Sequence, residues 1–265
     1  MRALIIRGSN EIPAEKVTSL LTNAGIDCFD YQVLHEPQLD LVNESICYAK
    51  EVGAQFVVSV GGGSAIDLGK AVSALLTNPG KLSDYLEVVG KGKQLINSSI
   101  PLIAVPTTAG TGSEVTRNAV IGVPEKQIKV SLRSSYLLPR VALIDPELTI
   151  SLPRGVTAST GMDALTQLIE PLVTKKSNWM VDCLCRDGIA RIARALPSAY
   201  KTPSDLIARE SMSYASLLSG LALANAGLGA VHGFAGPIGG MFDAPHGAVC
   251  AKLLPAGVRM NIDVL

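Results

Sequence analysis

Short apolar runs alternate with helical patterns over the first half of this chain. Glycine, proline or polar residues close each run, which is typical of buried strands, and the segments between them repeat apolar residues with a helical period. The predicted strands cover residues 3–6, 28–33, 56–60, 102–105 and 141–144. The predicted helices cover residues 14–24, 41–51 and 64–76, the last with Ser64 as its N-cap. This alternation predicts an α/β fold, a doubly wound parallel sheet with right-handed crossovers.

The pattern changes after Asp145-Pro146, beyond which the sequence shows no further alternating strand. Helical periodicity continues over residues 157–173, 178–196, 204–226, 229–241 and 248–261. We therefore predict two domains, an α/β domain over residues 1–148 and an all-helical domain over residues 149–265.

One stretch of the second half, Ser211–Phe242, contains no Asp, Glu, Lys or Arg and is long enough to cross a membrane. Gly, Ser, Asn and Pro recur within it, however, and it also contains His232. These residues favour a pair of buried helices, so no membrane association is expected.

Composition narrows the class of protein further. Hydrophobic residues make up 48% of the chain and aromatic residues only 4%, so the core is expected to be aliphatic. The formal net charge is zero and no basic run is present, which argues against a nucleic-acid partner. Five cysteines without a disulfide-like spacing, and an N-terminus too poor in apolar residues for a signal peptide, predict a cytoplasmic protein.

Two glycine- and hydroxyl-rich loops follow predicted strands. The first is Gly61-Gly62-Gly63-Ser64, which leads from a buried strand into a helix, and the second is Thr107–Ser113. Glycines allow a close backbone approach, and a helix N-terminus offers free N–H groups to a phosphate. Alone, either loop could be a simple capped turn, but two of them at the carboxyl ends of strands in one sheet predict a nucleotide site.

A second candidate site combines scarce residue types. Two of the three histidines, His232 and His246, lie close in sequence, and Asp163 and Gln167 are one helical turn apart. Imidazole and carboxylate are common ligands of divalent transition metals. Taken singly, Asp163 is better explained as a charge near a helix N-terminus and His232 as a buried, hydrogen-bonded histidine. Together these residues predict a metal site.

With these motifs in order, the chain resembles the iron-containing, or group III, alcohol dehydrogenase family. The matching pieces run over essentially the whole chain and are Gly61-Gly62-Gly63-Ser64 with Asp67 and Lys70, Pro106–Thr111, Gly161–Thr166, His232 and Pro245-His246-Gly247. The resemblance implies an NAD(P)-dependent oxidoreductase that acts on a small alcohol or aldehyde, with a dinucleotide-binding domain over 1–148 and a helical metal and substrate domain over 149–265. It also implies a homo-oligomer.

The resemblance further implies the residues of both sites. The cofactor, NADP or NAD, would be bound by Gly62, Gly63, Ser64, Asp67, Thr107, Thr108, Thr111, Asn118 and Lys129. The metal, Fe²⁺ or Zn²⁺, would be bound by Asp163, Gln167, His232 and His246. No catalytic residue separate from the metal site is implied, and the sequence does not identify the substrate.

Several positions depart from the family pattern. The family usually has histidine at the position of Gln167, whose carbonyl oxygen is a weaker donor, and many members have another at Gly236. Arg7-Gly8 follows the first strand, at a position where family members that prefer NAD tend to have aspartate. An aspartate there would repel the 2′-phosphate of NADP, so Gly8 beside Arg7 should tolerate that cofactor. The chain also looks shorter than family members at both ends.

These departures keep alternatives open. One is a metal-free reductase of the same fold that resembles maleylacetate reductase, and another is a non-catalytic remnant that only binds the cofactor. A lyase resembling 3-dehydroquinate synthase is less favoured, because the motifs contain few cationic residues for a phosphorylated substrate.

Overall fold

A computed structural model describes residues 1–242 and 244–264 of the chain. The residues form two compact units. The α/β unit comprises Met1–Thr107 and Thr116–Ile144, and the helical unit comprises Thr108–Val115 together with the chain from Asp145 onward. The domain limits predicted from the sequence, 1–148 and 149–265, and the roles given to those domains stay a prediction.

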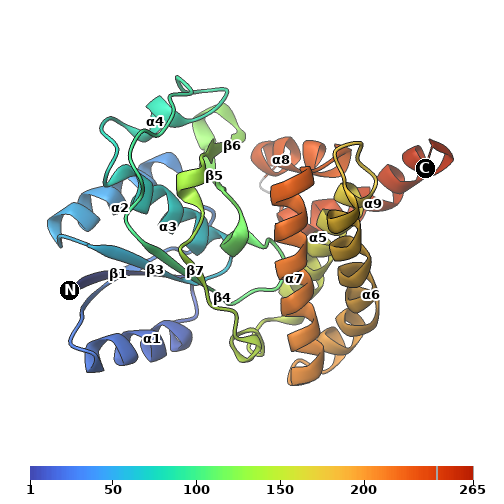
Figure 1. The fold of residues 1–265 in the computed structure, drawn as a ribbon, viewed down its shortest axis with the longest axis horizontal. Coiled ribbons are helices and arrows are strands. Elements are labelled where there is room, and N and C mark those ends of the chain that lie inside the picture. The colour runs from blue at the N-terminus through green and yellow to red at the C-terminus, as the bar shows by residue number, and fades with distance from the viewer. Residues whose placement is uncertain (243, 265) are drawn as a thin grey trace. The chain divides into compact units, whose positions relative to one another are not determined.

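The α/β unit is built on a five-stranded parallel sheet with strand order β2-β1-β3-β4-β7. Its strands are β1 (Arg2–Arg7), β2 (Asp27–Gln32), β3 (Phe56–Gly61), β4 (Leu102–Pro106) and β7 (Val141–Ala142). Figure 1 shows α1 (Ile12–Asn23) on one face of this sheet and α2 (Leu39–Glu51) and α3 (Gly63–Leu75) on the other. Every residue of β3 is buried, as expected for a central strand covered on both faces. The predicted α/β fold is therefore confirmed.

The start of α3 differs from its prediction by two residues. Gly62, not Ser64, is the N-cap, with an extended backbone at φ −78° and ψ −168°. Ser64 lies inside the first turn of the helix. The glycines allow the tighter entry because an added Cβ on Gly61 would lie 2.7 Å from the Cβ of Ala65.

An antiparallel hairpin in the α/β unit was not predicted. Strands β5 (Asn118–Val123) and β6 (Ile128–Arg133) pair in register from Asn118 with Arg133 to Val123 with Ile128. Alternate residues of β5 are buried, which is the pattern of a strand with one face on a core. The short helix α4 (Leu82–Tyr85) precedes β4 in the chain. Single-turn 3₁₀ helices cover Ser113–Val115, Pro124–Lys126, Ser135–Leu137, Pro146–Thr149 and Ile262–Val264.

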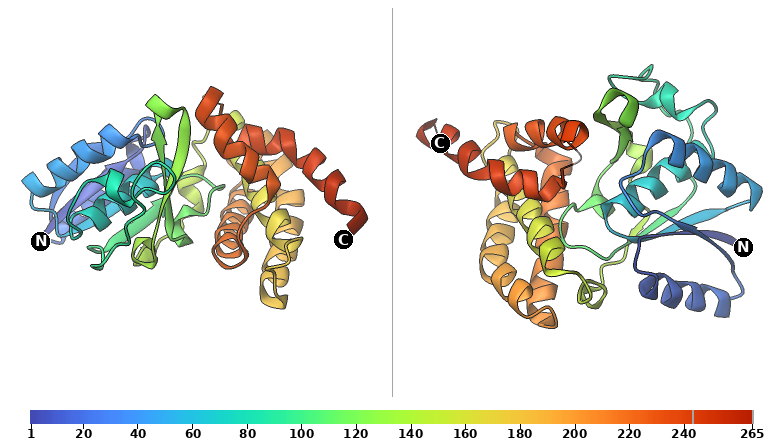
Figure 2. Two further views of the ribbon diagram at one scale, coloured as in Figure 1. Left: turned by 90° about the horizontal axis from the view of Figure 1, so that it is seen from above. Right: turned by 180° about the vertical axis from the view of Figure 1, so that it is seen from behind.

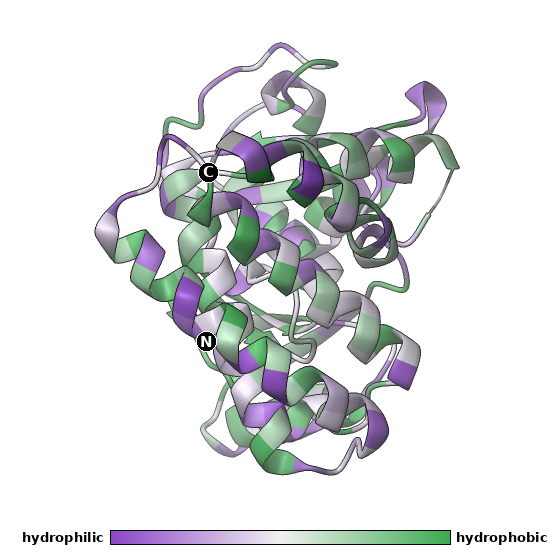
Figure 3. Ribbon diagram, turned by 90° about the vertical axis from the view of Figure 1, so that its right-hand side faces the viewer, coloured by the Kyte–Doolittle hydropathy of each residue, from purple (hydrophilic) through white to green (hydrophobic). Residues whose placement is uncertain are grey.

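The helical unit contains the remaining long helices, as the sequence pattern predicts. They are α5 (Arg154–Leu172), α6 (Trp179–Lys201), α7 (Leu206–Ala226), α8 (Ala230–Phe242) and α9 (His246–Asn261). A core of small and aliphatic side chains joins α5, α6 and α7. Close packing there uses glycine, since a Cβ on Gly188 of α6 would lie 2.7 Å from Leu168 of α5. Figure 3 shows hydrophilic and hydrophobic segments alternating along the helices, and Figure 2 shows the same ribbon from above and from behind.

The charge-free stretch identified in the sequence forms α7 and α8. Among the described residues no single helix is long and apolar enough to cross a membrane, although α7 and α8 pass such a test as a pair bent by 102°. Both helices are only partly buried: α7 buries Ala208, Met212, Ala215, Leu218, Ala222 and Ala226 but exposes Leu206, Ile207 and Tyr214, and α8 buries one face and exposes Phe234 and Phe242. The expectation of two buried helices therefore holds in part for each helix.

Candidate functional site

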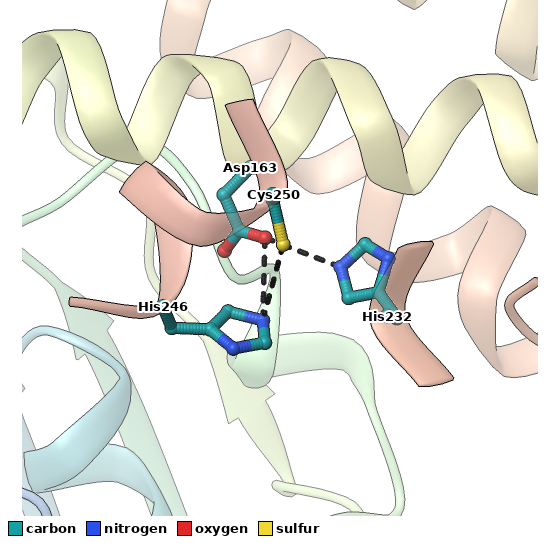
Figure 4. Close-up of side chains that lie close together, drawn as sticks. All are labelled: Asp163, His232, His246 and Cys250. Carbon is teal, nitrogen blue, oxygen red and sulfur yellow. Dashed lines mark hydrogen bonds and ion pairs between the residues drawn. The ribbon is translucent and has the colours of Figure 1, made fainter. Parts of the chain in front are cut away.

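Three helices of the helical unit bring four potential metal ligands together. Asp163 comes from α5, His232 from α8, and both His246 and Cys250 come from α9. One donor atom from each lies within 4.8 Å of the other three. Figure 4 shows the four side chains pointing toward one another. Three of the four residues predicted from the sequence as metal ligands therefore converge, and Cys250 joins them.

The Asp163 carboxylate is central to this cluster. Its Oδ1 lies 3.2 Å from Nε2 of His232 and 3.6 Å from Nε2 of His246. The Sγ atom of Cys250 lies 3.7 Å from the same His246 nitrogen. Asp163 and Cys250 are buried, whereas the side chain of His246 is 34% exposed, so the cluster is open to solvent on the His246 side.

The local sequence explains how α9 reaches this position. His246 and Cys250 are one helical turn apart, so both project from the same face of α9. Gly247, between them, lies directly against α5, where an added Cβ would be 2.2 Å from the carbonyl oxygen of Ser159. Only glycine permits this approach, and the helix places both donors beside Asp163 as a result.

A buried carboxylate that the sequence analysis did not identify orients His232. Glu170, on α5, accepts a hydrogen bond from Nδ1 of His232 through Oε2 at 2.5 Å. Its other oxygen accepts the backbone N–H of Val231 at 2.7 Å, in the first turn of α8. A helix N-terminus favours an anion, so Glu170 both anchors α8 and turns Nε2 of His232 toward Asp163.

The charges of the cluster shift the pKa values of its members. Burial alone would lower the pKa of His232, but hydrogen bonds to Asp163, Cys250 and Glu170 outweigh burial and raise that pKa to about 11. Burial would raise the pKa of the Cys250 thiol, yet contacts with both imidazoles lower it. The two carboxylates therefore favour positive charge at His232, which is the kind of charge that a bound divalent cation would supply.

The geometry of Asp163, His232 and His246 suits a divalent ion. Oxygen and nitrogen donors bound to one tetrahedral ion lie roughly 3.3 Å apart. The two separations from Asp163 Oδ1, 3.2 and 3.6 Å, are close to that value. A buried carboxylate and two imidazoles are also the donor types that Fe²⁺ and Zn²⁺ accept, so the residues present fit the ion that the sequence predicts.

Gln167, the fourth predicted ligand, is buried on α5 one turn after Asp163. Its amide Nε2 donates to the carbonyl oxygen of Thr111 at 2.9 Å and lies 3.0 Å from Oγ of Ser219 on α7. These bonds hold the Thr111 loop against α5 and α7. A role for the Gln167 carbonyl oxygen as a metal ligand stays a prediction.

The predicted phosphate-binding residues lie at the carboxyl ends of two neighbouring strands of the α/β unit. Gly62, Gly63 and Ser64 follow β3, and Thr107 follows β4. The backbone N–H of Thr107 donates to the carbonyl oxygen of Gly61 at 2.9 Å, which joins the two loops. Among the described residues no side chain caps α3. The N–H groups of Ala65 and Ile66 donate to the carbonyl oxygen of Gly62, so Gly63 and Ser64 are the residues whose N–H groups could receive an anion at this helix N-terminus.

Other predicted cofactor residues of the α/β unit hold its hairpin in place. The Asp67 carboxylate accepts the backbone N–H of Val120 at 2.9 Å. Lys70, fully buried, lies 3.6 Å from Asp67 and donates to the carbonyl oxygen of Asn118 at 2.8 Å. Lys129, on β6, forms an ion pair with Glu36 at 2.5 Å.

The last two predicted cofactor residues, Thr108 and Thr111, belong to the helical unit. Thr111 Oγ1 accepts the backbone N–H of Ser113 at 3.3 Å, in a turn that continues through Gly112. Gly112 has φ +59° and lies against Gly220 of α7, where any Cβ would clash. Packing of the loop on α7 therefore accounts for its glycine.

Two residues of the cluster were missed in the sequence, each for a different reason. Cys250 follows His246 by four residues on a helix, a spacing that could have indicated a shared site. Glu170 follows Asp163 by seven residues, two helical turns, and so shares its face of α5. A single glutamate at helical spacing is common, so that second signal is weak.

Comparison with known proteins identifies relatives along the chain. The family model for iron-containing alcohol dehydrogenase matches residues 1–146, and the model for the C-terminal part of the same family matches residues 157–264. Alcohol dehydrogenase 4 of Saccharomyces cerevisiae strain YJM789 is 41% identical over 248 residues, which are 93% of this chain and 64% of that protein. The 1,3-propanediol dehydrogenase of Klebsiella pneumoniae is 39% identical over 97% of this chain and 66% of its own length.

Solved structures agree in fold. A 1,3-propanediol oxidoreductase has a TM-score of 0.93 at 38% identity, covering 98% of this chain and 68% of that one. A sulfoacetaldehyde reductase from Bifidobacterium kashiwanohense in complex with NAD⁺ has a TM-score of 0.89 at 30% identity, covering 98% of this chain and 69% of that one. The chain thus spans about two thirds of the length of the relatives it matches, with 64% and 66% for the two curated ones.

Proposed function

We propose an activity from the premise that this chain belongs to the iron-containing alcohol dehydrogenase family. The proposed reaction is hydride transfer between a nicotinamide cofactor, NAD or NADP, and an alcohol–aldehyde or alcohol–ketone pair. Relatives named as alcohol and propanediol dehydrogenases support a small alcohol or aldehyde as substrate. The single observation that carries the proposal is the convergence of Asp163, His232 and His246 from three helices.

The metal site has a defined part in this proposal. A divalent ion bound there would act as a Lewis acid toward the substrate oxygen. Asp163 would bind it as an anion, His232 and His246 would bind it through Nε2, and Glu170 would fix the ring of His232 by accepting its Nδ1 proton. The solvent-open side of the cluster at His246 leaves room for a substrate oxygen.

The cofactor site is proposed on the glycine-rich turn of the α/β unit. Gly62, Gly63 and Ser64 would receive the pyrophosphate with backbone N–H groups at the start of α3. Gly61 lies close to Gly8, where an added Cβ would be 3.1 Å from the Gly8 nitrogen, so glycine keeps the ends of β3 and β1 together beside this turn. Thr107 adds a hydroxyl at the end of the neighbouring strand.

The cofactor type follows from the end of β1. Gly8 stands where an aspartate would repel a 2′-phosphate, so no carboxylate at that position excludes NADP. We therefore expect the site to accept NADPH as well as NADH. Comparison of kcat/KM for the two cofactors checks this, and exclusive use of NADH would contradict it.

The function is tested by reconstituting metal-free protein with Fe²⁺ or Zn²⁺ and following NADH and NADPH oxidation across a panel of small aldehydes. His246→Ala should abolish metal-dependent turnover while leaving the cofactor Kd nearly unchanged, because His246 lies in the metal cluster. His35→Ala is the matched control, since His35 is exposed in the α/β unit. Turnover that needs no metal would instead support the metal-free reductase, and cofactor binding without turnover would support the non-catalytic remnant.

A homo-oligomer and a cytoplasmic location complete the proposal. The helical unit exposes several large apolar side chains, which supports contact with another subunit. They are Trp179, Met180, Phe234, Phe242, Met260 and Ile262. Light scattering coupled to gel filtration measures the mass in solution, and a monomer at working concentration would contradict the oligomer.

A further inference from the structure

We propose that Cys250 is the fourth protein ligand of the metal site and that its sulfur shifts the preference of the site from Fe²⁺ toward Zn²⁺ or Co²⁺. The site would then have one carboxylate, two imidazoles and one thiolate. This inference rests on the proposed function, because it concerns the ion that Asp163, His232 and His246 would hold.

The separations between donor atoms support a ligand set that includes sulfur. On a tetrahedral zinc ion, with Zn–S of about 2.3 Å and Zn–N of about 2.05 Å, sulfur and nitrogen lie roughly 3.6 Å apart. Cys250 Sγ lies 3.7 Å from His246 Nε2, and all four donors are within 4.8 Å of one another.

The position of Cys250 on its helix also supports the assignment. Cys250 is fully buried, and Figure 4 shows its sulfur between the Asp163 carboxylate and the two imidazoles. His246 and Cys250 project from one face of α9, so a single rigid helix presents both donors. The same approach of α9 to α5 at Gly247 that places His246 therefore places the thiol as well.

The residue in the expected fourth position is a weaker candidate. Gln167 already uses its amide nitrogen to hold Thr111 and Ser219, at 2.9 and 3.0 Å. Its carbonyl oxygen is neutral and hard, whereas a thiolate is anionic and soft and selects Zn²⁺ over harder ions. The thiol proton would pass to solvent as the metal–sulfur bond forms, so no oxidant or reductant is needed.

The test is a titration of the metal-free protein with Co²⁺, followed by absorption spectroscopy. A thiolate bound to Co²⁺ produces a sulfur-to-metal charge-transfer band in the near ultraviolet, which oxygen and nitrogen ligands do not give. We expect this band in the wild-type protein and in the control variant Cys183→Ser, because Cys183 is an exposed cysteine of the same unit. The Cys250→Ser protein should not show the band, and its affinity for Zn²⁺ should be more than about tenfold lower. Its preference for Zn²⁺ over Fe²⁺ should also be smaller than that of the wild-type protein.

X-ray absorption of the zinc-loaded wild-type protein provides a readout that needs no variant. One sulfur at about 2.3 Å from the zinc supports the proposal. Metal binding with only oxygen and nitrogen ligands, or a charge-transfer band that persists in Cys250→Ser, overturns the Cys250 assignment and leaves the proposed oxidoreductase intact. Failure of both Zn²⁺ and Co²⁺ to bind overturns this assignment together with the metal-dependent function.

Discussion

At the scale of single residues, metal binding at this site depends on how His232 is held. His232 lies between two carboxylates, with Nδ1 bonded to Glu170 and Nε2 facing Asp163. This arrangement fixes the ring before any ion arrives, because both nitrogens already have a defined partner. A ligand oriented in advance loses less entropy on binding, so Glu170 should matter for metal affinity although it is not placed among the ligands.

Glu170→Gln tests this positioning role. The amide keeps the size of the side chain but removes the charge that attracts the Nδ1 proton, so Zn²⁺ affinity should fall about 10- to 100-fold with the fold retained. Competition titration against a chelator measures the affinity, and circular dichroism checks the fold. Glu210→Gln is the control because Glu210 is exposed on α7. Equal affinities in the two variants would refute the role.

A second residue-scale prediction concerns pH and stability. Burial, with a smaller contribution from Asp182, raises the pKa of Cys185 from 9.0 to about 11. The unfolded chain therefore loses this proton at lower pH than the folded one, so the stabilisation is complete below pH 9 and is lost as the pH rises toward 11. Between pH 9 and about pH 11, the free energy of unfolding of the wild-type protein should fall by about 2 kcal/mol more than that of Cys185→Ala. Urea unfolding across this pH range measures the difference. Parallel pH profiles would contradict the shift.

At the scale of elements, each unit contains one close approach that positions candidate residues. Gly247 lets α9 lie directly on α5, and in the α/β unit Asp67 and Lys70 of α3 hold the β5–β6 hairpin. Both contacts involve backbone atoms, which cannot move aside as the end of a flexible side chain can. A single substitution at either place should therefore shift a whole element.

Gly247→Ala tests the first contact. The new methyl group would lie 2.2 Å from the Ser159 carbonyl oxygen, so α9 must move away from α5. We expect a loss of about 1–3 kcal/mol of stability together with weaker metal binding. Gly233→Ala on α8 meets open space and should instead stabilise by about 0.5–1 kcal/mol. Thermal unfolding of both variants measures this, and a stabilised Gly247→Ala would be incompatible with the packing described.

Asp67→Ala tests the second contact. Removing this carboxylate takes an ionic partner from Lys70, whose ammonium is fully buried, so unfolding free energy should fall by about 3 kcal/mol. Asp40→Ala, on the exposed face of α2, should change it by less than about 0.5 kcal/mol. Urea unfolding separates the outcomes. An Asp67→Ala variant that is fully stable but binds cofactor poorly would favour the direct cofactor role implied by the family resemblance.

At the scale of the whole molecule, the sequence predicts helices and strands with a regular hydrophobic pattern better than elements that depend on tertiary contacts. Buried parallel strands such as β3 are continuous apolar runs, and long helices such as α6 repeat their apolar positions over many turns, so both were found. The β5–β6 hairpin was missed because it is held by a contact with α3, in which Val120 donates its backbone N–H to Asp67. Local pattern does not encode that contact.

The residues of the candidate metal site also fall into two groups, those that the sequence predicts and those that only the fold reveals. Histidine is rare in this chain, so His232 and His246 stand out as candidate metal ligands. Asp163 can be recognised as a third candidate from the family motif. Cys250 and Glu170 are residue types that usually pack in a core or lie on a helix surface, and only the folding together of α5, α8 and α9 gives them a shared role. That convergence is tertiary and cannot be deduced from spacing within one helix.

The proposed function requires that Asp163, His232 and His246 bind one divalent ion. The most direct test is a crystal structure of the zinc-loaded protein with anomalous data collected on both sides of the zinc absorption edge. We expect one strong anomalous peak about 2.0–2.2 Å from Asp163 Oδ1 and from Nε2 of both histidines. If saturating zinc gives no peak at this position, or binds elsewhere on the chain, binding of one ion by Asp163, His232 and His246 is contradicted.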